Sequence, residues 1–170
     1  MLNQILSDLL FIKEKTRARS FVYVFFFNKS FQLIMLHRIL SFTWTKTFLR
    51  PLRTPMRFFF SFLTSCEIHP DACIGRYIFF PHPIGIVIGQ KSIIGDNVTI
   101  YQNVTIGGRT NSEGFLLYPT LKQNVTIFCN TCILGSSVIG ANSTVGACSL
   151  VLTSFPANST IYGSPAKLKS

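Results

Sequence analysis

An apolar residue returns at every sixth position over most of residues 68–151, and this repeat constrains the fold more than any other feature of the chain. Neither the α-helical period near 3.6 residues nor the β-strand period of two generates it. Hexapeptide periodicity is typical of a parallel β-helix, in which three short strands close a triangular coil and each directs one side chain inward. Glycine follows several of these anchor residues, and we expect it to let the chain turn the corners. The anchors are Ile68, Ile74, Phe80, Ile88, Ile94, Ile100, Ile106, Leu121, Ile127, Ile133, Ile139, Val145 and Val151.

The repeat is interrupted twice, and both interruptions are candidate functional loops. Two extra residues enter between Phe80 and Ile88, and a longer insertion separates Gly107 from Leu121. Insertions into a solenoid emerge as loops, which often carry function. We therefore expect residues 108–120 to form an extruded loop of the β-helix.

The residues before the repeat have helical periodicity instead. The pattern predicts a helix from Met1 to about Arg19, a second from Phe31 to about Trp44, and a short helix that resumes near Met56 after two prolines. Composition changes abruptly near residue 65. The sequence thus predicts a mainly β chain, with a short α-helical N-terminal region over residues 1–65 and a β-helix over residues 66–170. The apolar residues expected on one side of the first helix are Leu2, Ile5, Leu6, Leu9, Leu10 and Phe11.

The formal charge of +10 is concentrated in the N-terminal region. Residues 1–60 hold ten Lys or Arg against two acids, Asp8 and Glu14, and they are rich in aromatic residues. No apolar run reaches the eighteen or so residues that span a bilayer. This composition favours peripheral contact with anionic lipid at the inner face of the cytoplasmic membrane. The alternative is that the aromatic residues form a helical core or a contact between subunits. Nucleic acid binding is not expected, because no recognition motif accompanies the charge.

Cysteine and histidine usage argues against a metal centre. The five cysteines are an odd number and no secretory signal peptide precedes them, so free thiols in a reducing cytoplasm are the simplest interpretation. Cys129 and Cys132 form a CxxC inside the repeat, but no second CxxC accompanies them, and we interpret both as ordinary coil residues. A zinc site between stacked coils needs three histidines, and none follows His82.

His82 is the candidate catalytic residue, because it lies between two prolines in an interruption of the repeat. A neutral imidazole accepts a proton from a hydroxyl at physiological pH when a second group fixes its tautomer. Glu67 is the candidate second group: fifteen residues separate it from His82, slightly less than one coil, so we expect the two to be neighbours across stacked coils. The alternative interpretation is a loop histidine and a solvated carboxylate.

Several stretches of the chain resemble the serine acetyltransferase branch of the hexapeptide acyltransferases. They are EIHPDACIG at residues 67–75, PHPIGIVIG at 81–89, IGDNVTIYQNVTIGG at 94–108 and GSPAK at 163–167, and QLIMLHR at 32–38 resembles the helix before the domain. The resemblance implies a left-handed parallel β-helix, an exception to the usual right-handed crossover. It also implies a homotrimer, with acetyl-CoA between neighbouring β-helices, and leaves open a pairing of two trimers through the N-terminal helices.

The resemblance also implies roles for individual residues. His82 matches the general base that deprotonates an acceptor hydroxyl for direct attack on the acetyl thioester, and Glu67 matches a carboxylate, usually Asp, that orients this histidine. Gly108 matches the glycine that lets the pantetheine arm approach the backbone. The remaining positions of the cofactor groove fall at Cys129, Thr144, Ala147 and Lys167, and the family often has a basic residue where this chain has Thr144.

Departures from the family lie where serine would bind. Serine acetyltransferases have Asp immediately before the catalytic histidine and Arg-His after the extruded loop, where this chain has Pro81, Leu117 and Tyr118. Those charged side chains hold the ammonium and carboxylate of serine, and a buried ion without a partner costs roughly several kcal/mol. We therefore expect the acceptor to be a sugar of a bacterial surface or capsular polysaccharide. Tyr118 would stack on the sugar ring, and Arg109 would meet an acidic sugar or a CoA phosphate.

Two alternatives remain open. Serine as acceptor would make the chain an enzyme of cysteine biosynthesis, and it requires new groups in place of those lost. A non-catalytic trimeric scaffold is the alternative from another class, and the presence of both His82 and Glu67 argues against it.

Overall fold

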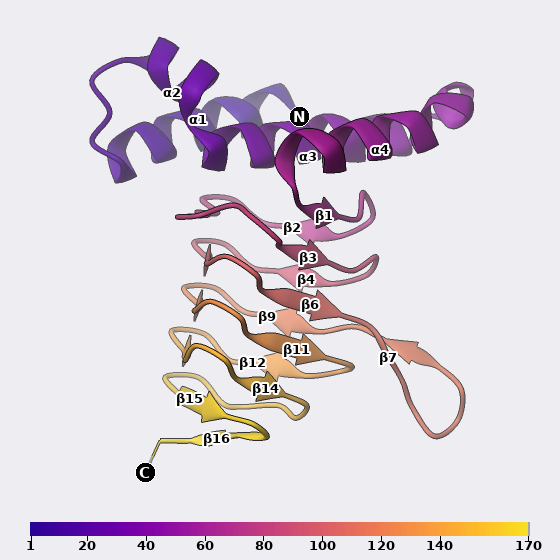
Figure 1. Cartoon of the computed structure of the whole chain (residues 1–170), viewed down its shortest axis with the longest axis vertical. Helices are drawn as coiled ribbons and strands as arrows, with labels where there is room; N and C mark the ends of the chain where they lie inside the picture. Colours follow the sequence, from indigo (N-terminus) through magenta and orange to yellow (C-terminus); the bar gives the residue numbers. More distant parts are fainter. Residues whose placement is uncertain (170) are drawn as a thin grey trace.

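A layer of helices lies across one end of a three-walled parallel β-helix in the computed structural model, which describes residues 1–169 (Figure 1). The predicted fold class, a left-handed parallel β-helix preceded by a short α-helical region, is confirmed. The helices are α1 (Leu2–Lys15), α2 (Phe21–Phe27), α3 (Lys29–Trp44), the 3₁₀ helix η1 (Thr47–Leu52) and α4 (Arg53–Thr64).

Each wall of the β-helix is a stack of short parallel strands, one from each coil. The first wall contains β1 (Glu67–Ile68), β3 (Val87–Ile88), β6 (Thr105–Gly107), β11 (Cys132–Leu134) and β14 (Leu150–Val151). The second contains β2 (Cys73–Ile74), β4 (Ile93–Ile94), β9 (Thr120–Leu121) and β12 (Val138–Ile139). The third contains β5 (Thr99–Ile100), β10 (Thr126–Ile127), β13 (Thr144–Val145) and β15 (Thr160–Gly163), and it is closed by the antiparallel strand β16 (Ala166–Leu168).

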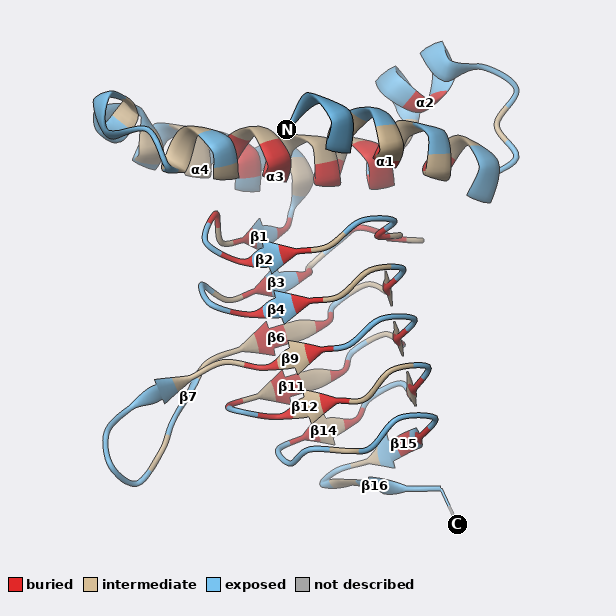
Figure 2. Cartoon of the chain, turned by 180° about the vertical axis from the view of Figure 1, so that it is seen from behind, coloured by how far each residue is buried: buried red, intermediate tan, exposed pale blue. Residues whose placement is uncertain are grey.

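The anchors of the repeat form the interior of the coils. All of them are buried, and they lie in register along each wall, as where Ile106 pairs with Ile88 above and Ile133 below. Figure 2 shows the buried residues recurring at the same place in successive coils. The residues that recur with a period of six are therefore the residues of the hydrophobic core.

Asparagine, not glycine, makes the left-handed turn at many corners. Glycine after an anchor was expected to turn the chain, but Gly95 and the other glycines at this position lie outside the left-handed φ region. Six asparagines have positive φ instead, five of them three residues before an anchor and the sixth three residues before the buried Ile161: Asn97, Asn103, Asn124, Asn130, Asn142 and Asn158. Asparagine tolerates this conformation better than other L residues because its short polar side chain bonds locally. Their amides also stack, with Asn124 donating to Asn142 at 2.8 Å and accepting from Asn97 at 2.9 Å.

The glycines after anchors serve close packing between coils. A Cβ at Gly95 would lie 2.7 Å from the backbone carbon of Lys122, and one at Gly140 would lie 2.2 Å from the backbone nitrogen of Ala157. These distances leave no room for a side chain against the neighbouring coil.

The helical layer differs from the prediction in which residues it buries. In α1, Ile12 and Asp8 are buried, whereas Leu2, Leu6 and Leu10 are exposed, so the expected apolar side of this helix is only partly correct. The helix α2, which the sequence pattern did not predict, is capped by Ser20 and buries only Val24. The helix α4 begins at Arg53, three residues before the expected start, because Pro55 fits within its first turn.

Candidate active site at two ends of the first wall

His82 lies in the loop between the third and first walls, where it is exposed to a cavity of about 320 Å³ under the helical layer. The lining includes Tyr23 and Phe27 of α2 and Lys29 at the start of α3. The loop is held by a hydrogen bond from the Gly85 amide to the Ser65 carbonyl, 2.9 Å. The imidazole is therefore presented to solvent at a fixed corner of the first coil.

Aromatic rings continue from His82 along the same edge of the β-helix. The imidazole lies 6.4 Å from the Tyr101 ring, centroid to centroid, and Tyr101 stacks on Phe128 at 5.0 Å. The sequence pattern did not predict Tyr101, Phe128 or Lys29 as site residues. The first two occupy equivalent positions in successive coils, directly after the anchors Ile100 and Ile127, and this recurrence is the signal that could have found them.

Two of the predicted cofactor residues lie on the edge that carries His82. Backbone hydrogen bonds connect successive coils there, from Asn103 to Ile84 at 2.9 Å, from Asn130 to Gln102 at 3.1 Å and from Cys148 to Cys129 at 2.9 Å. Cys129 and Ala147 therefore lie below the His82 loop on one continuous edge. The structure brings these predicted residues together.

Glu67 lies at a second cavity, of about 370 Å³, on the first wall. Gly108 and Tyr118 line the same cavity. The Tyr118 ring lies over Gly108, since a Cβ at that glycine would be 2.9 Å from the Tyr118 Cε1 atom. The Glu67 carboxylate accepts a hydrogen bond from Arg57 of α4, Oε1 to Nη2 3.0 Å, and both side chains are substantially exposed.

Within one chain the structure does not bring Glu67 and His82 together. In the first wall Glu67 pairs with Val87, five residues after His82, so the expected contact across stacked coils is wrong for a single chain. The physical reason is that the extra residues of the His82 loop displace the imidazole to the corner, whereas Glu67 points outward from the flat wall. The two side chains line separate cavities.

The other predicted residues lie further down the molecule. Arg109 is exposed in β7 (Arg109–Thr110), which pairs antiparallel with β8 (Leu116–Leu117) in a hairpin that projects from the β-helix (Figure 1). Thr144 is half-buried in β13, and Lys167 is exposed in β16 opposite Tyr162. Leu117 in β8 is half-buried and carries no charge.

The electrostatics of the first wall come from a few groups. Burial, helped by the nearby Arg57, lowers the pKa of His69, whose Nδ1 atom accepts a hydrogen bond from the Asp71 amide at 3.1 Å. Burial raises the pKa of Cys132, so the second thiol of the CxxC is not an activated one. In residues 1–169 no group of three or more His, Cys, Asp and Glu side chains is placed to hold a metal ion.

A β-helix of hexapeptide coils with a histidine loop at its first corner defines the class of hexapeptide-repeat acyltransferases. The soybean serine acetyltransferase complexed with serine is 32% identical, with a TM-score of 0.88 over 98% of this chain and 68% of that chain. A serine acetyltransferase in complex with CoA gives a TM-score of 0.87 at 28% identity, over 98% of this chain and 68% of that one. The chain belongs to the serine acetyltransferase family.

The curated proteins that match the chain have a higher sequence identity to it than the solved structures do, but the matched segment is shorter. The serine acetyltransferase of Staphylococcus xylosus is 48% identical over 107 residues, which are 63% of this chain and 49% of that protein. The chain thus spans about half the length of the curated relatives it matches. No protein-family model matches the chain.

Proposed function

We propose that the chain is an acetyl-CoA-dependent O-acetyltransferase with His82 as its general base. The observation that carries the proposal is the exposed imidazole at the head of an edge that also holds Cys129 and Ala147. A donor molecule lying along this edge would place its thioester next to the histidine. The serine acetyltransferase in complex with CoA is consistent with this donor.

The proposed chemistry needs no group beyond the imidazole and the thioester. Neutral His82 takes the proton of the acceptor hydroxyl as its oxygen attacks the acetyl carbonyl. The resulting tetrahedral intermediate expels the CoA thiolate, which takes the proton from the imidazolium. The products are an acetyl ester and free CoA, and the histidine returns to its neutral form.

We propose that a second copy of the chain completes the site, within a homotrimer. The edge with His82 and the face with Glu67, Gly108 and Tyr118 lie on different parts of one chain, so a neighbouring first wall could bring the second set to the first. Glu67 of the neighbour would then orient the imidazole, as a carboxylate does in other histidine bases. Gly108 and Lys167 would contact the pantetheine arm and the phosphates of CoA, and Thr144 would contribute only a neutral hydroxyl.

For the acceptor, the comparisons favour L-serine over the saccharide expected from the sequence. The relatives are serine acetyltransferases, and one structural relative is complexed with serine. Pro81, Leu117 and Tyr118 still provide no charge, but the structure offers Lys29 at the His82 cavity. Its ammonium group could pair with the serine carboxylate in place of the arginine that the family has after its extruded loop. We therefore propose L-serine as the acceptor, with Lys29 as its carboxylate partner.

A saccharide hydroxyl remains the second candidate, because Tyr118 presents a ring in a cavity whose lining, among the described residues, includes no Lys or Arg. Release of free CoA thiol from acetyl-CoA, measured with L-serine or with a panel of surface polysaccharides, distinguishes the two acceptors.

Serine-dependent release that is abolished in His82→Ala supports the first proposal. Lys29→Ala should then raise the KM for serine about tenfold or more and leave the KM for acetyl-CoA unchanged. Lys46→Ala, two residues past the opposite end of α3, should alter neither. Release with a polysaccharide alone would establish the second candidate. A protein that neither binds acetyl-CoA nor releases CoA would be a scaffold.

A further inference from the structure

The helix α2 is an almost wholly exposed apolar element. Its sequence is FVYVFFF, only Val24 is buried, and Val22 and Phe26 are 64% and 61% exposed on the same side of the helix. Chains that act alone in water rarely expose contiguous apolar patches of this kind, so the exposed face of α2 needs a partner.

The position of α2 suits contact with an extended surface. The helix projects from the helical layer at the end of the molecule opposite to the C-terminus (Figures 1 and 2). No helix in the part of the chain that the structure describes is long and apolar enough to cross a bilayer. A short projecting element of this kind reaches into an interface without spanning it.

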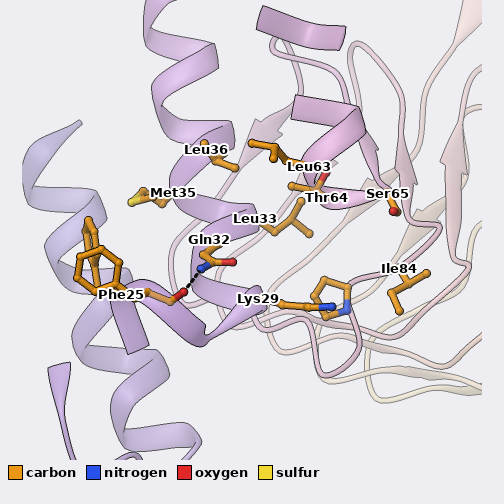
Figure 3. A pocket seen from close by; sticks show the side chains of 12 residues that line it. Phe25, Lys29, Gln32, Leu33, Met35, Leu36, Leu63, Thr64, Ser65 and Ile84 are labelled. Atoms are coloured by element: carbon orange, nitrogen blue, oxygen red, sulfur yellow. Dashed lines mark hydrogen bonds between the residues drawn. The ribbon is translucent and has the colours of Figure 1, made fainter. Parts of the chain in front are cut away.

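The apolar surface of α2 continues into the body of the protein. A cavity of about 490 Å³ is lined by residues of α2, α3 and α4, and α2 contributes Phe25 and Phe26 to its lining. Figure 3 shows Phe25 and the labelled residues of α3 around it. The remaining apolar lining of the cavity includes Leu33, Met35, Leu36, Leu63 and Ile84. The exposed rings of α2 are thus joined to an apolar space large enough to accept part of an acyl chain.

Basic residues precede α2 in the chain. Lys13, Lys15, Arg17 and Arg19 lie within the eight residues before Phe21, against the single acid Glu14. The Lys13 ammonium lies 4.4 Å from the centre of the Phe21 ring. Within residues 1–169 none of these four cations forms an ion pair with a carboxylate. Their charge is therefore available to an anionic partner.

We propose that α2 docks on an anionic phospholipid bilayer, with its aromatic side chains at the boundary between headgroups and acyl chains and the basic residues 13–19 against the headgroups. Interfacial helices bind through this combination of apolar burial and attraction to anionic lipid. A symmetric pairing with the α2 face of a second copy is disfavoured, because it would bring two clusters of cations together. The proposal does not depend on which acceptor the enzyme uses.

Co-sedimentation with vesicles tests the proposal on the full-length chain. Wild-type protein should bind vesicles of phosphatidylcholine with 30% phosphatidylglycerol, and bind pure phosphatidylcholine or the mixed vesicles in 0.5 M NaCl at least about tenfold more weakly. The double variant Val22→Ser/Phe26→Ser should lose binding to the mixed vesicles by a similar factor. Phe58→Ser/Phe62→Ser is the matched control, since it removes an even more exposed apolar pair, with rings stacked at 6.4 Å, from α4.

Three outcomes would overturn the proposal. They are an absence of binding to anionic vesicles, a loss of binding in the α4 variant but not in the α2 variant, and a lower oligomer mass of the α2 variant in lipid-free solution. The last result would make α2 a contact between protein chains. Catalytic assays with a soluble acceptor report on the proposed function separately, because neither Val22 nor Phe26 lines the His82 cavity.

Discussion

Arg38 of α3 and Asp8 of α1 form an ion pair, Nε to Oδ2 3.2 Å, with both side chains almost completely buried. The same guanidinium donates to the backbone carbonyls of Ile74 and Gly75 in the first coil. Burial raises the pKa of Asp8, and the charge of Arg38 and its hydrogen bond oppose that rise. One side chain thus connects two helices to the β-helix, and it satisfies carbonyl groups that the helical layer covers.

Replacing Arg38 should therefore be costly. We expect Arg38→Met to lower the free energy of unfolding by about 3–5 kcal/mol, because it leaves Asp8 and the two carbonyls without a partner in the interior. Arg76→Met is the control: Arg76 lies 3.9 Å from Asp96 in an exposed pair, and its loss should cost less than about 1 kcal/mol. Urea unfolding of the three proteins measures both values. Equal effects of the two substitutions would contradict the assigned role of Arg38.

His37 should make the fold sensitive to acid. Burial, with the neighbouring Arg38, lowers the pKa of His37 to about 3, and its Nδ1 atom has no hydrogen-bond partner within the described residues. In the unfolded chain the same imidazole takes up a proton near pH 6.5. The stability that depends on a neutral His37 is thus complete above pH 6.5 and is lost as the pH falls towards 3, at about 1.4 kcal/mol per pH unit.

The variant His37→Leu should remove this dependence. Between pH 6 and pH 4 its free energy of unfolding should fall by roughly 2–3 kcal/mol less than that of the wild type. Other groups titrate in both proteins, so the difference between the two curves isolates His37. Parallel curves would show that the imidazole is protonated in the fold.

The β-helix could be predicted from the sequence because the position of each anchor in the six-residue repeat is enough to predict that it is buried. Ile106 and Ile133, for example, are assigned to the core from their positions alone. The helical layer could not be predicted as well, because burial there depends on residues distant in the chain. Asp8 is buried because Arg38 meets it, and no local pattern places a carboxylate on the inner side of α1. In α2 every residue is apolar, so the sequence has no periodicity that distinguishes a helix from a strand.

The candidate site was predicted residue by residue but not as an arrangement. His82, Cys129 and Ala147 share an edge because their positions in successive coils are equivalent, and a repeat reveals that equivalence. Glu67 was expected beside His82 because fifteen residues nearly complete a coil. The two extra residues of the His82 loop make the number of residues in this coil irregular. Sequence spacing also does not show on which side of the wall the displaced imidazole lies.

The asparagine ladder should contribute through both backbone conformation and hydrogen bonds. Asn124 has a φ of +58°, donates to Asn142 and accepts from Asn97. Asn124→Ala should lower the free energy of unfolding by about 2 kcal/mol, since it loses the hydrogen bonds and strains the corner. Asn124→Gly should lose about half as much, because glycine adopts this φ without strain. Thermal or urea unfolding measures the difference, and equal losses would mean that the corner carries no strain in the alanine variant.

Close packing of coils should make glycine essential at some corners and dispensable at others. Gly95→Ala should cost about 2–3 kcal/mol, because its methyl group meets the rigid backbone of the next coil. At Gly107 the nearest atom is the flexible Leu134 Cδ2 at 3.3 Å, so Gly107→Ala should cost less than about 1 kcal/mol. Comparison of their midpoints in urea tests this ranking, which a reversed order would refute.

Mixing two inactive variants tests whether the site lies between copies. His82→Ala and Glu67→Ala should each lower kcat/KM by about a hundredfold or more, if the imidazole acts as base and the carboxylate orients it. In the arrangement we propose, a mixed trimer would contain one interface where an intact His82 faces an intact Glu67, whereas every chain in it carries one substitution. In the proposed homotrimer, random assembly of equal amounts should therefore restore roughly a quarter of the wild-type sites in the unfractionated mixture, and roughly a third in mixed trimers isolated through both tags. A site formed within one chain predicts no recovery at all. Co-expression of the two variants with different affinity tags, followed by tandem purification and the CoA release assay, distinguishes the two arrangements, and each variant purified alone serves as the baseline.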